Sequence, residues 1–146
     1  MKRICLLLLT ILSLAGCATS VRYVNYTDEK FLPKPQYYFI TIYHDSQHPP
    51  SIQPYSVIGR VEVSGYISDG VNPDTLTDQA KTIARKKGAD AIINAKTESA
   101  NYSGVYVASG YIAYHRCYRS YHPTEYIPYS NTLLTFRGEL IVFSSH

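Results

Sequence analysis

Residues 57–67 (VIGRVEVSGYI) alternate between apolar and polar side chains, which is the pattern of a β-strand with one buried face. The residues expected on the buried face are Val57, Val61 and Val63, and those expected on the polar face are Arg60, Glu62 and Ser64. Gly59 and Gly65 predict β-bulges within this strand. The pattern therefore predicts one long strand that is buried on one side.

The next segment has the signals of a helix that starts at Pro73 and ends at Gly88. Asn72 can cap the first turn, proline suits the first helical position, and glycine is the usual residue just beyond the last turn. The cations at 85–87 complement the negative end of the helix dipole. Apolar side chains recur every three or four residues and form one stripe: Leu76, Ala80, Ile83 and Ala84.

Four further segments predict strands because they are rich in β-branched and aromatic residues. They are residues 37–44, 89–97, 104–117 and 132–143. Loops are expected at 45–55 and 118–131, with a polar turn at 99–103. One alternative stays open, because the spacing of three, four and three residues between Tyr111, Tyr114, Tyr118 and Tyr121 also fits one face of a helix.

Together these elements predict an α+β fold. We expect a small four- to five-stranded antiparallel or mixed sheet with one amphipathic helix packed on one face. Residues 37–146 are expected to form this single domain, since a chain of that length can bury one hydrophobic core. Residues 17–36 show no periodicity and contain Pro33 and Pro35, so they predict an extended tether.

The first sixteen residues carry the signals of a secretory leader. Lys2 and Arg3 precede an apolar run that is too short to span a bilayer. The sequence LAGC at 14–17 then resembles the lipobox of bacterial lipoproteins, which implies cleavage between Gly16 and Cys17 and a lipid anchor, including palmitate, on Cys17. Ala18 is not the aspartate that resembles an inner-membrane retention signal, so we expect the periplasmic face of the outer membrane.

Charge and cysteine content narrow the picture once the leader is removed. Without Lys2 and Arg3 the chain has 12 basic and 11 acidic side chains, which does not favour a nucleic-acid partner. Lipidation would use Cys17 and leave Cys117 as the one mature thiol, so no disulfide within the chain is expected. Cys117 then remains open as a buried thiol, a reactive thiol or a metal ligand.

Candidate chemistry is sparse. His115 and Cys117 would share one face of a strand, and a loop could return His122, which together would suit zinc or copper. A fourth ligand is missing, so we expect no cofactor and keep this metal or small-ligand site as the alternative. No nucleophile elbow and no paired acids in an apolar setting occur in the sequence, so we do not expect an enzyme.

The centre of the chain resembles a known fold. Gly59, the helix alanines Ala80 and Ala84, the run GADA at 88–91 and Gly110 with Ala113-Tyr114 follow a recognisable order. This arrangement looks like the small α/β fold of the YbjQ-type heavy-metal-binding family and of the Rcs envelope stress sensor lipoprotein. The paired disulfides of the Rcs sensor have no counterpart here, and no metal-ligand motif can be transferred. The resemblance therefore implies a fold and leaves the function open.

Tyrosine is the outstanding feature of the composition. The chain has 15 tyrosines, and eight of them lie between Tyr102 and Tyr129. Tyrosine suits sheets that face water or a partner, and it is enriched at protein interfaces. The candidate partner surface is Tyr111, Tyr114, Tyr118 and Tyr121. We therefore expect a protein-binding lipoprotein that docks another envelope protein, as a stress-sensing component or as an accessory subunit of an assembly such as a secretion complex.

Overall fold

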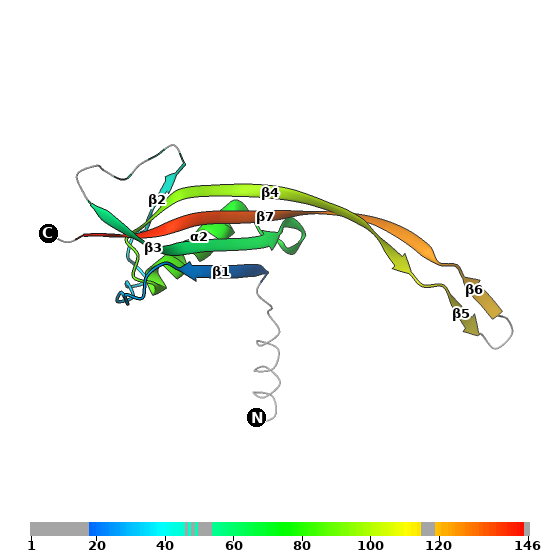
Figure 1. Ribbon diagram of the computed structural model, residues 1–146. Coiled ribbons are helices and arrows are strands. Elements are labelled where there is room, and N and C mark those ends of the chain that lie inside the picture. Colours follow the sequence, from blue (N-terminus) through cyan, green and yellow to red (C-terminus); the bar gives the residue numbers. More distant parts are fainter. Residues whose placement is uncertain (1–17, 46, 48, 50–53, 115–118, 145–146) are drawn as a thin grey trace, which may run out of the picture.

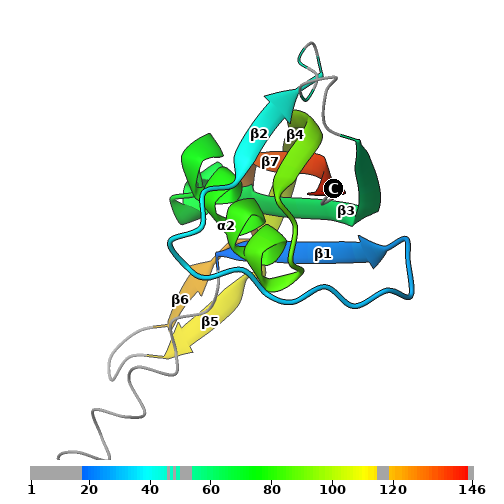
Figure 2. The same cartoon turned by 90° about the vertical axis from the view of Figure 1, so that its left-hand side faces the viewer.

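The computed structural model of the protein describes residues 18–45, 47, 49, 54–114 and 119–144. Its main sheet has five strands in the order β1-β3-β7-β4-β2, and a single helix packs on one face of this sheet (Figures 1 and 2). The parallel pair is β2 with β4, and the other neighbours are antiparallel. The predicted α+β class and mixed five-stranded sheet are confirmed.

The elements have the following bounds. The main sheet contains β1 (Thr19–Asn25), β2 (Thr41–His44), β3 (Tyr55–Tyr66), β4 (Ala91–Ala108) and β7 (Glu125–Phe143). A 3-10 turn, η1 (Ile67–Asp69), follows β3 and leads to helix α2 (Pro73–Lys86). A second, two-stranded sheet pairs β5 (Tyr111–Tyr114) with β6 (Arg119–His122). Within the described ranges, no helix is long and apolar enough to cross a membrane.

Helix α2 follows its sequence signals. The Asn72 side chain accepts a hydrogen bond from the Thr75 N–H at 2.9 Å, and Pro73 occupies the first helical position. Gly88 has the left-handed backbone (φ +78°) that was predicted to end the helix. The buried residues on its sheet-facing side are Leu76, Ala80 and Ala84, with Ile83 partly buried beside them. The predicted apolar stripe is therefore the face that covers the sheet.

The core lies between α2 and one face of the sheet. Its largest fully buried side chains include Phe136 and Leu140 from β7, Ile58 from β3, Ile92 from β4 and Leu76 from the helix. No side chain within the described ranges is buried and polar at the same time. The fold is thus held mainly by apolar packing of the helix on strands β3, β4 and β7.

Strand β3 contains the bulge predicted at Gly59, where its register against β7 shifts between Val57 and Gly59. The shift changes which side chains before Gly59 face the core. Val57 packs on the opposite face, against Ala91 and Ile141, and Ile58 takes its place in the core beneath the helix. The expected face of Val57 was therefore wrong, because the extra residue in a bulge moves the preceding side chains to the other side.

No bulge occurs at Gly65, whose pairing is regular on both sides, with Thr19 in β1 and with Leu134 in β7. The prediction of a bulge there was wrong. A Cβ at this position would lie 2.7 Å from a Val71 methyl and 2.8 Å from the Ala18 carbonyl oxygen. Glycine is present at this site because neighbouring chain segments approach closely.

At the N-terminal side, the structure differs from the extended tether that was expected at residues 17–36. Residues 19–25 form strand β1, which pairs with β3 along its whole length. Further along, the Lys34 N–H donates to the Arg85 carbonyl at 2.8 Å, so the proline-containing part is attached to the end of the helix. Strand β1 is an edge strand of the sheet, and both ends of the expected tether belong to the folded body.

The chain beyond Thr97 is also more ordered than predicted. The polar segment 99–103 is not a turn, because β4 continues through it to Ala108 while β7 starts at Glu125. Much of the loop expected at 118–131 is likewise strand, in β6 and β7. The turn-forming residues Asn101 and Ser103 pair with Thr132 and Ser130, so their backbone groups join a ladder that local propensity does not reveal.

The first predicted strand, 37–44, is shorter in the structure, where β2 begins at Thr41. Tyr38, which precedes β2, nevertheless has a structural role because it contacts Asp90. The Tyr38 hydroxyl donates to one carboxylate oxygen of Asp90 at 2.8 Å, the Lys34 ammonium lies 2.7 Å from the same oxygen, and the Phe143 N–H donates to the other at 3.0 Å. Asp90 thus joins the N-terminal segment to the end of β7.

Asp90 should make stability depend on pH. Burial raises the pKa of its carboxyl, but the hydrogen bonds from Lys34, Tyr38 and the Phe143 amide lower the pKa further, so the net shift is downward. Because the folded pKa lies below the unfolded value of about 4, this stabilisation is present above about pH 4 and is lost as the pH falls through the folded value. In Asp90→Asn, urea unfolding should show a free energy lower by about 1–2 kcal/mol at pH 7 and a flatter decline toward acid.

The matched control is Asp78→Asn on the solvent side of α2, where Asp78 is 78% exposed and lies 3.8 Å from Lys81. This change should alter the free energy of unfolding by less than about 0.5 kcal/mol, since exposed pairs contribute little. Equal effects of the two substitutions would contradict the role assigned to Asp90.

Candidate functional site

Strands β4 and β7 continue together well past the body of the protein and form a curved two-stranded projection (Figure 1). The last residue of β3 that pairs with β7 is Tyr66, opposite Leu133. Beyond that point eight consecutive pairs, from Asn101 with Thr132 to Ala108 with Glu125, have no third strand beside them among the described residues. We call residues 101–108 and 125–132 the arm. Eight strand residues span about 26 Å.

The root of the arm is fastened to the corner where β3 passes into η1. The Asn131 amide donates to the Ser68 hydroxyl at 2.8 Å, and the Tyr102 ring meets the Tyr66 ring edge-on at 6.5 Å between centroids. The Thr132 hydroxyl donates to the Asn101 side chain across the ladder at 2.8 Å. These contacts fix the direction in which the arm leaves the sheet.

One face of the arm, which we call the tyrosine face, continues the side of the sheet that α2 leaves open. Cross-strand partners share a face and alternate residues lie on the same side, which places four large side chains together. They are Tyr102, Tyr106, Ile127 and Tyr129, each between 40% and 64% exposed. The Tyr106 and Tyr129 rings lie 4.5 Å apart, and the Tyr129 ring covers Gly104, where a Cβ would meet it at 2.6 Å.

The other face, which we call the valine face, is also apolar. It carries Val105, Val107, Tyr126 and Pro128, and the first three are 54%, 58% and 72% exposed. A two-stranded ribbon is marginally stable in water by itself. Exposed apolar side chains on both faces of so thin a ribbon make the arm the candidate site for binding another molecule.

The arm differs sharply in charge from the sheet behind it. No Asp, Glu, Lys or Arg occurs from Ser99 to Tyr114 or from Tyr126 to Phe136. Just behind the root, the Arg137 guanidinium bonds Glu62 at 2.9 Å and Glu98 at 2.8 Å, and Lys96 lies 2.8 Å from Glu98 and lowers its pKa. These charges are paired with one another, so the uncharged surface has a defined boundary.

The sequence-predicted residues fall in and around the far end of this projection. The backbone of Tyr111 and Tyr114 lies in β5, and that of Tyr121 and His122 lies in β6, so this part is strand and not helix. Tyr118, His115 and Cys117 lie outside the described residues, as do Gly16 and Cys17. The partner role of these tyrosines and the metal site at His115, Cys117 and His122 therefore stay predictions. Within the described ranges, no three His, Cys, Asp or Glu side chains gather as metal ligands.

Sequence reasoning chose Tyr111, Tyr114, Tyr118 and Tyr121 as the partner surface, and that choice stays a prediction. It did not single out Tyr102, Tyr106, Tyr126 and Tyr129, which the long pairing of β4 with β7 places on one projection. All of them except Tyr106 lie in segments that were predicted to be a turn or a loop. The sequence signal that could have indicated the arm is the absence of charged residues in the segments 99–114 and 126–136. Such segments are uncommon on the surface of a monomer.

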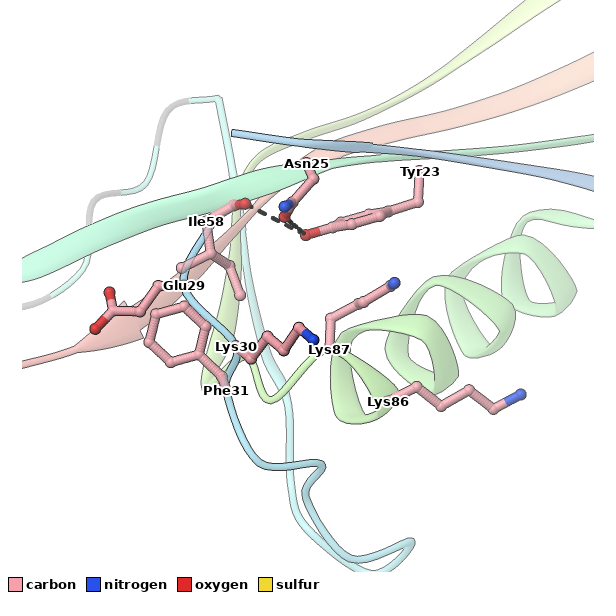
Figure 3. A pocket seen from close by; sticks show the side chains of 8 residues that line it. All are labelled: Tyr23, Asn25, Glu29, Lys30, Phe31, Ile58, Lys86 and Lys87. Carbon is pink, nitrogen blue, oxygen red and sulfur yellow. Dashed lines mark hydrogen bonds between the residues drawn. The ribbon is translucent and has the colours of Figure 1, made fainter. Parts of the chain in front are cut away.

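A separate pocket of about 450 Å³ lies between β1, the loop that follows it and the end of α2 (Figure 3). The Tyr23 hydroxyl there lies 3.0 Å from the Asn25 side-chain oxygen and 3.3 Å from the Ile58 carbonyl oxygen, and burial raises its pKa. The Lys87 ammonium sits 4.6 Å from the centre of the Tyr23 ring. These groups contact one another across the pocket and hold β1 against the helix end, which is a structural role.

Comparison with known proteins leaves the family open. No protein-family model and no curated protein match the sequence. A crystal structure of a Francisella virulence factor, FvfA, is similar, with 17% sequence identity and a TM-score of 0.42 over 84% of this chain and 96% of that one. The resemblance of residues 57–117 to the YbjQ-type family and the Rcs sensor stays a prediction.

Proposed function

We propose that this protein is a lipoprotein of the outer membrane that binds another envelope protein through its arm. The observation that carries the proposal is an uncharged two-stranded projection with exposed tyrosine, valine and isoleucine side chains on both faces. Interfaces are enriched in tyrosine and depleted of charge at their centres, which is the composition of the arm. In the stress-sensing or accessory roles expected from the sequence, the arm would be the part that meets the partner.

The start of β1, which follows the proposed anchor in the sequence, lies at the same end of the sheet as the root of the arm. Cys17 precedes Thr19 by two residues, and Thr19 pairs with Gly65, which pairs in turn with Leu134 at the root of the arm. Neighbouring strands are about 4.8 Å apart, so Thr19 lies roughly 10 Å from that root. A lipid on Cys17 would therefore hold the root of the arm close to the bilayer, where its orientation is constrained.

The chemistry of the arm indicates what its partner must present. The four large side chains of the tyrosine face offer ring surface together with hydroxyl groups, and the valine face offers aliphatic surface. A charged partner residue placed against either face would lose its hydration without gaining an opposite charge. The partner surface should accordingly be uncharged and supply hydrogen-bond partners for the tyrosine hydroxyls.

Photocrosslinking in the native envelope tests this proposal. Tyr106 is replaced by photoreactive benzoylphenylalanine in the full-length lipoprotein, and the same replacement is made at Tyr37, which is 90% exposed and lies outside the arm. Light should give a protein adduct from position 106 and little or none from position 37. Absence of an adduct at 106, or equal adducts at both positions, would overturn the assignment of the arm as the docking surface.

A further inference from the structure

We infer that the partner of the arm is the arm of another copy of this chain, so that several copies join side by side at the membrane. The inference rests on the proposed docking function and deepens it by naming the partner. Its basis is the shape of the arm, which presents two apolar faces and two edges with no neighbouring strand in the described part of the chain, and the absence of charge along it up to Glu125.

The two faces favour a repeated partner. A protein that docked on the tyrosine face would leave Val105, Val107 and Tyr126 exposed on the other side of the same thin ribbon. Other copies of the arm can cover both sides, because each copy brings both kinds of face. Burial of both faces is what the distribution of apolar side chains requires.

Charge gives the same indication. Whatever covers the arm must itself be uncharged over a length of about 26 Å. A second arm meets this requirement, because its one charged residue is Glu125 at the far end. The open sheet face behind the root carries the charged cluster of Glu62, Glu98 and Arg137 and does not meet it.

The edges supply a geometry for the contact. Along the arm, β4 and β7 are paired with each other, and their outer edges have no neighbour among the described residues. When two arms lie in the same direction, the outer β4 edge of one copy faces the outer β7 edge of the next, and the two strands are antiparallel, which suits strand addition. Pro128 lacks an N–H and removes one donor from the β7 edge, whereas the other arm residues keep theirs.

Interface size indicates more than two copies. A ribbon about 26 Å long and two strands wide has roughly 250 Å² on each face, whereas a stable interface buries about 800 Å² on each partner. One face is too small by itself, so a stable assembly needs several contacts on each arm, through edge pairing and through packing of faces. Contact of a β4 edge with a β7 edge is also heterologous, because the two copies use different edges. A pair of copies therefore keeps one free edge at each end. Further copies can add to these free edges until a ring closes.

The proposed anchor would assist this assembly. Lipid on Cys17 would confine all copies to one surface with the roots of their arms at the same height, which raises the effective concentration of each arm for its neighbours. Arms held in this way lie in the same direction, which is the arrangement that edge pairing needs.

The mass of the intact lipoprotein extracted in mild detergent tests the inference. The wild-type chain should have the mass of more than two copies by light scattering. The variant with Tyr106→Glu and Val107→Glu places one charge on each face of the arm and should fall to the mass of one copy. The matched control is Tyr37→Glu with Phe39→Glu, at side chains 90% and 78% exposed outside the arm, and it should keep the wild-type mass.

A second measurement does not depend on the folding of the charged variant. Two differently tagged copies, both with benzoylphenylalanine at position 106, are expressed together and illuminated in the intact envelope. An adduct that carries both tags supports self-association. An adduct with a different protein only would overturn self-association and leave docking in place, and no adduct at all would overturn both. A single-copy mass for the wild-type chain together with no doubly tagged adduct would also overturn the inference.

Discussion

Replacement of Cys17 by serine should abolish acylation of the protein completely. If Cys17 carries the diacylglycerol and an amide-linked acyl chain, as the lipobox implies, the serine variant has no thiol to accept the first lipid and is not processed as a lipoprotein. Two or three chains contribute about 0.8 kcal/mol for each buried methylene, so their loss removes the membrane affinity of the mature chain. Incorporation of labelled palmitate and the mass of the mature N-terminus measure the effect.

Cys117→Ser provides the matched control, because it makes the same chemical change at the other cysteine that remains after the leader is cleaved. This variant should keep the palmitate label and fractionate with the outer membrane. If palmitate labelling survived in Cys17→Ser and was lost in Cys117→Ser, the lipid would be on Cys117. The proposed position of the anchor near the root of the arm would then be wrong.

The largest effect on stability is expected for Phe136→Ala. Phe136 is 1% exposed and lies in the core cluster beneath α2, together with Leu76 and Leu140. Truncation of a buried phenylalanine leaves a cavity and costs about 3–5 kcal/mol, against a total stability of roughly 5–15 kcal/mol for a domain. Urea unfolding followed by circular dichroism should show this loss as a lower midpoint.

Tyr126→Ala serves as the comparison, since Tyr126 is an aromatic residue of the same strand but is 72% exposed on the valine face of the arm. Its removal should change the free energy of unfolding of the monomer by less than about 0.5 kcal/mol. A large loss would mean that the arm contributes to the stability of the single chain, which would weaken the case that its side chains await a partner.

The parts of the fold that sequence reasoning predicted depend on local signals. Asn72, Pro73 and Gly88 define helix α2 through capping, proline geometry and a left-handed residue, all of which act within a few positions. The register of β3 after Gly59 likewise follows from its own alternation. Each signal lies inside the element that it specifies, so no knowledge of distant residues was needed.

The parts that were missed depend on partners that are distant in sequence. Thr19–Asn25 becomes a strand because the edge of β3 is available about forty residues later, and neither segment reveals this pairing by itself. Asn101 and Ser103 have turn propensity but meet Thr132 and Ser130 across a long hairpin. The arm was not predicted for the same reason, since it exists only when both of its strands are recognised.

The two-residue separation between Cys17 and β1 also bears on the order of events during maturation. A peptidase that cuts before Cys17 needs an extended, accessible backbone on both sides of the bond. Thr19 is paired with Gly65 in the finished sheet. If Cys17 is lipidated and the leader removed as proposed, this end of β1 would have to be free of β3 during those steps. Processing would therefore precede closure of the sheet edge. On this proposal the pairing of Thr19 with Gly65 forms after the leader is removed, whatever the order in which the rest of the domain folds.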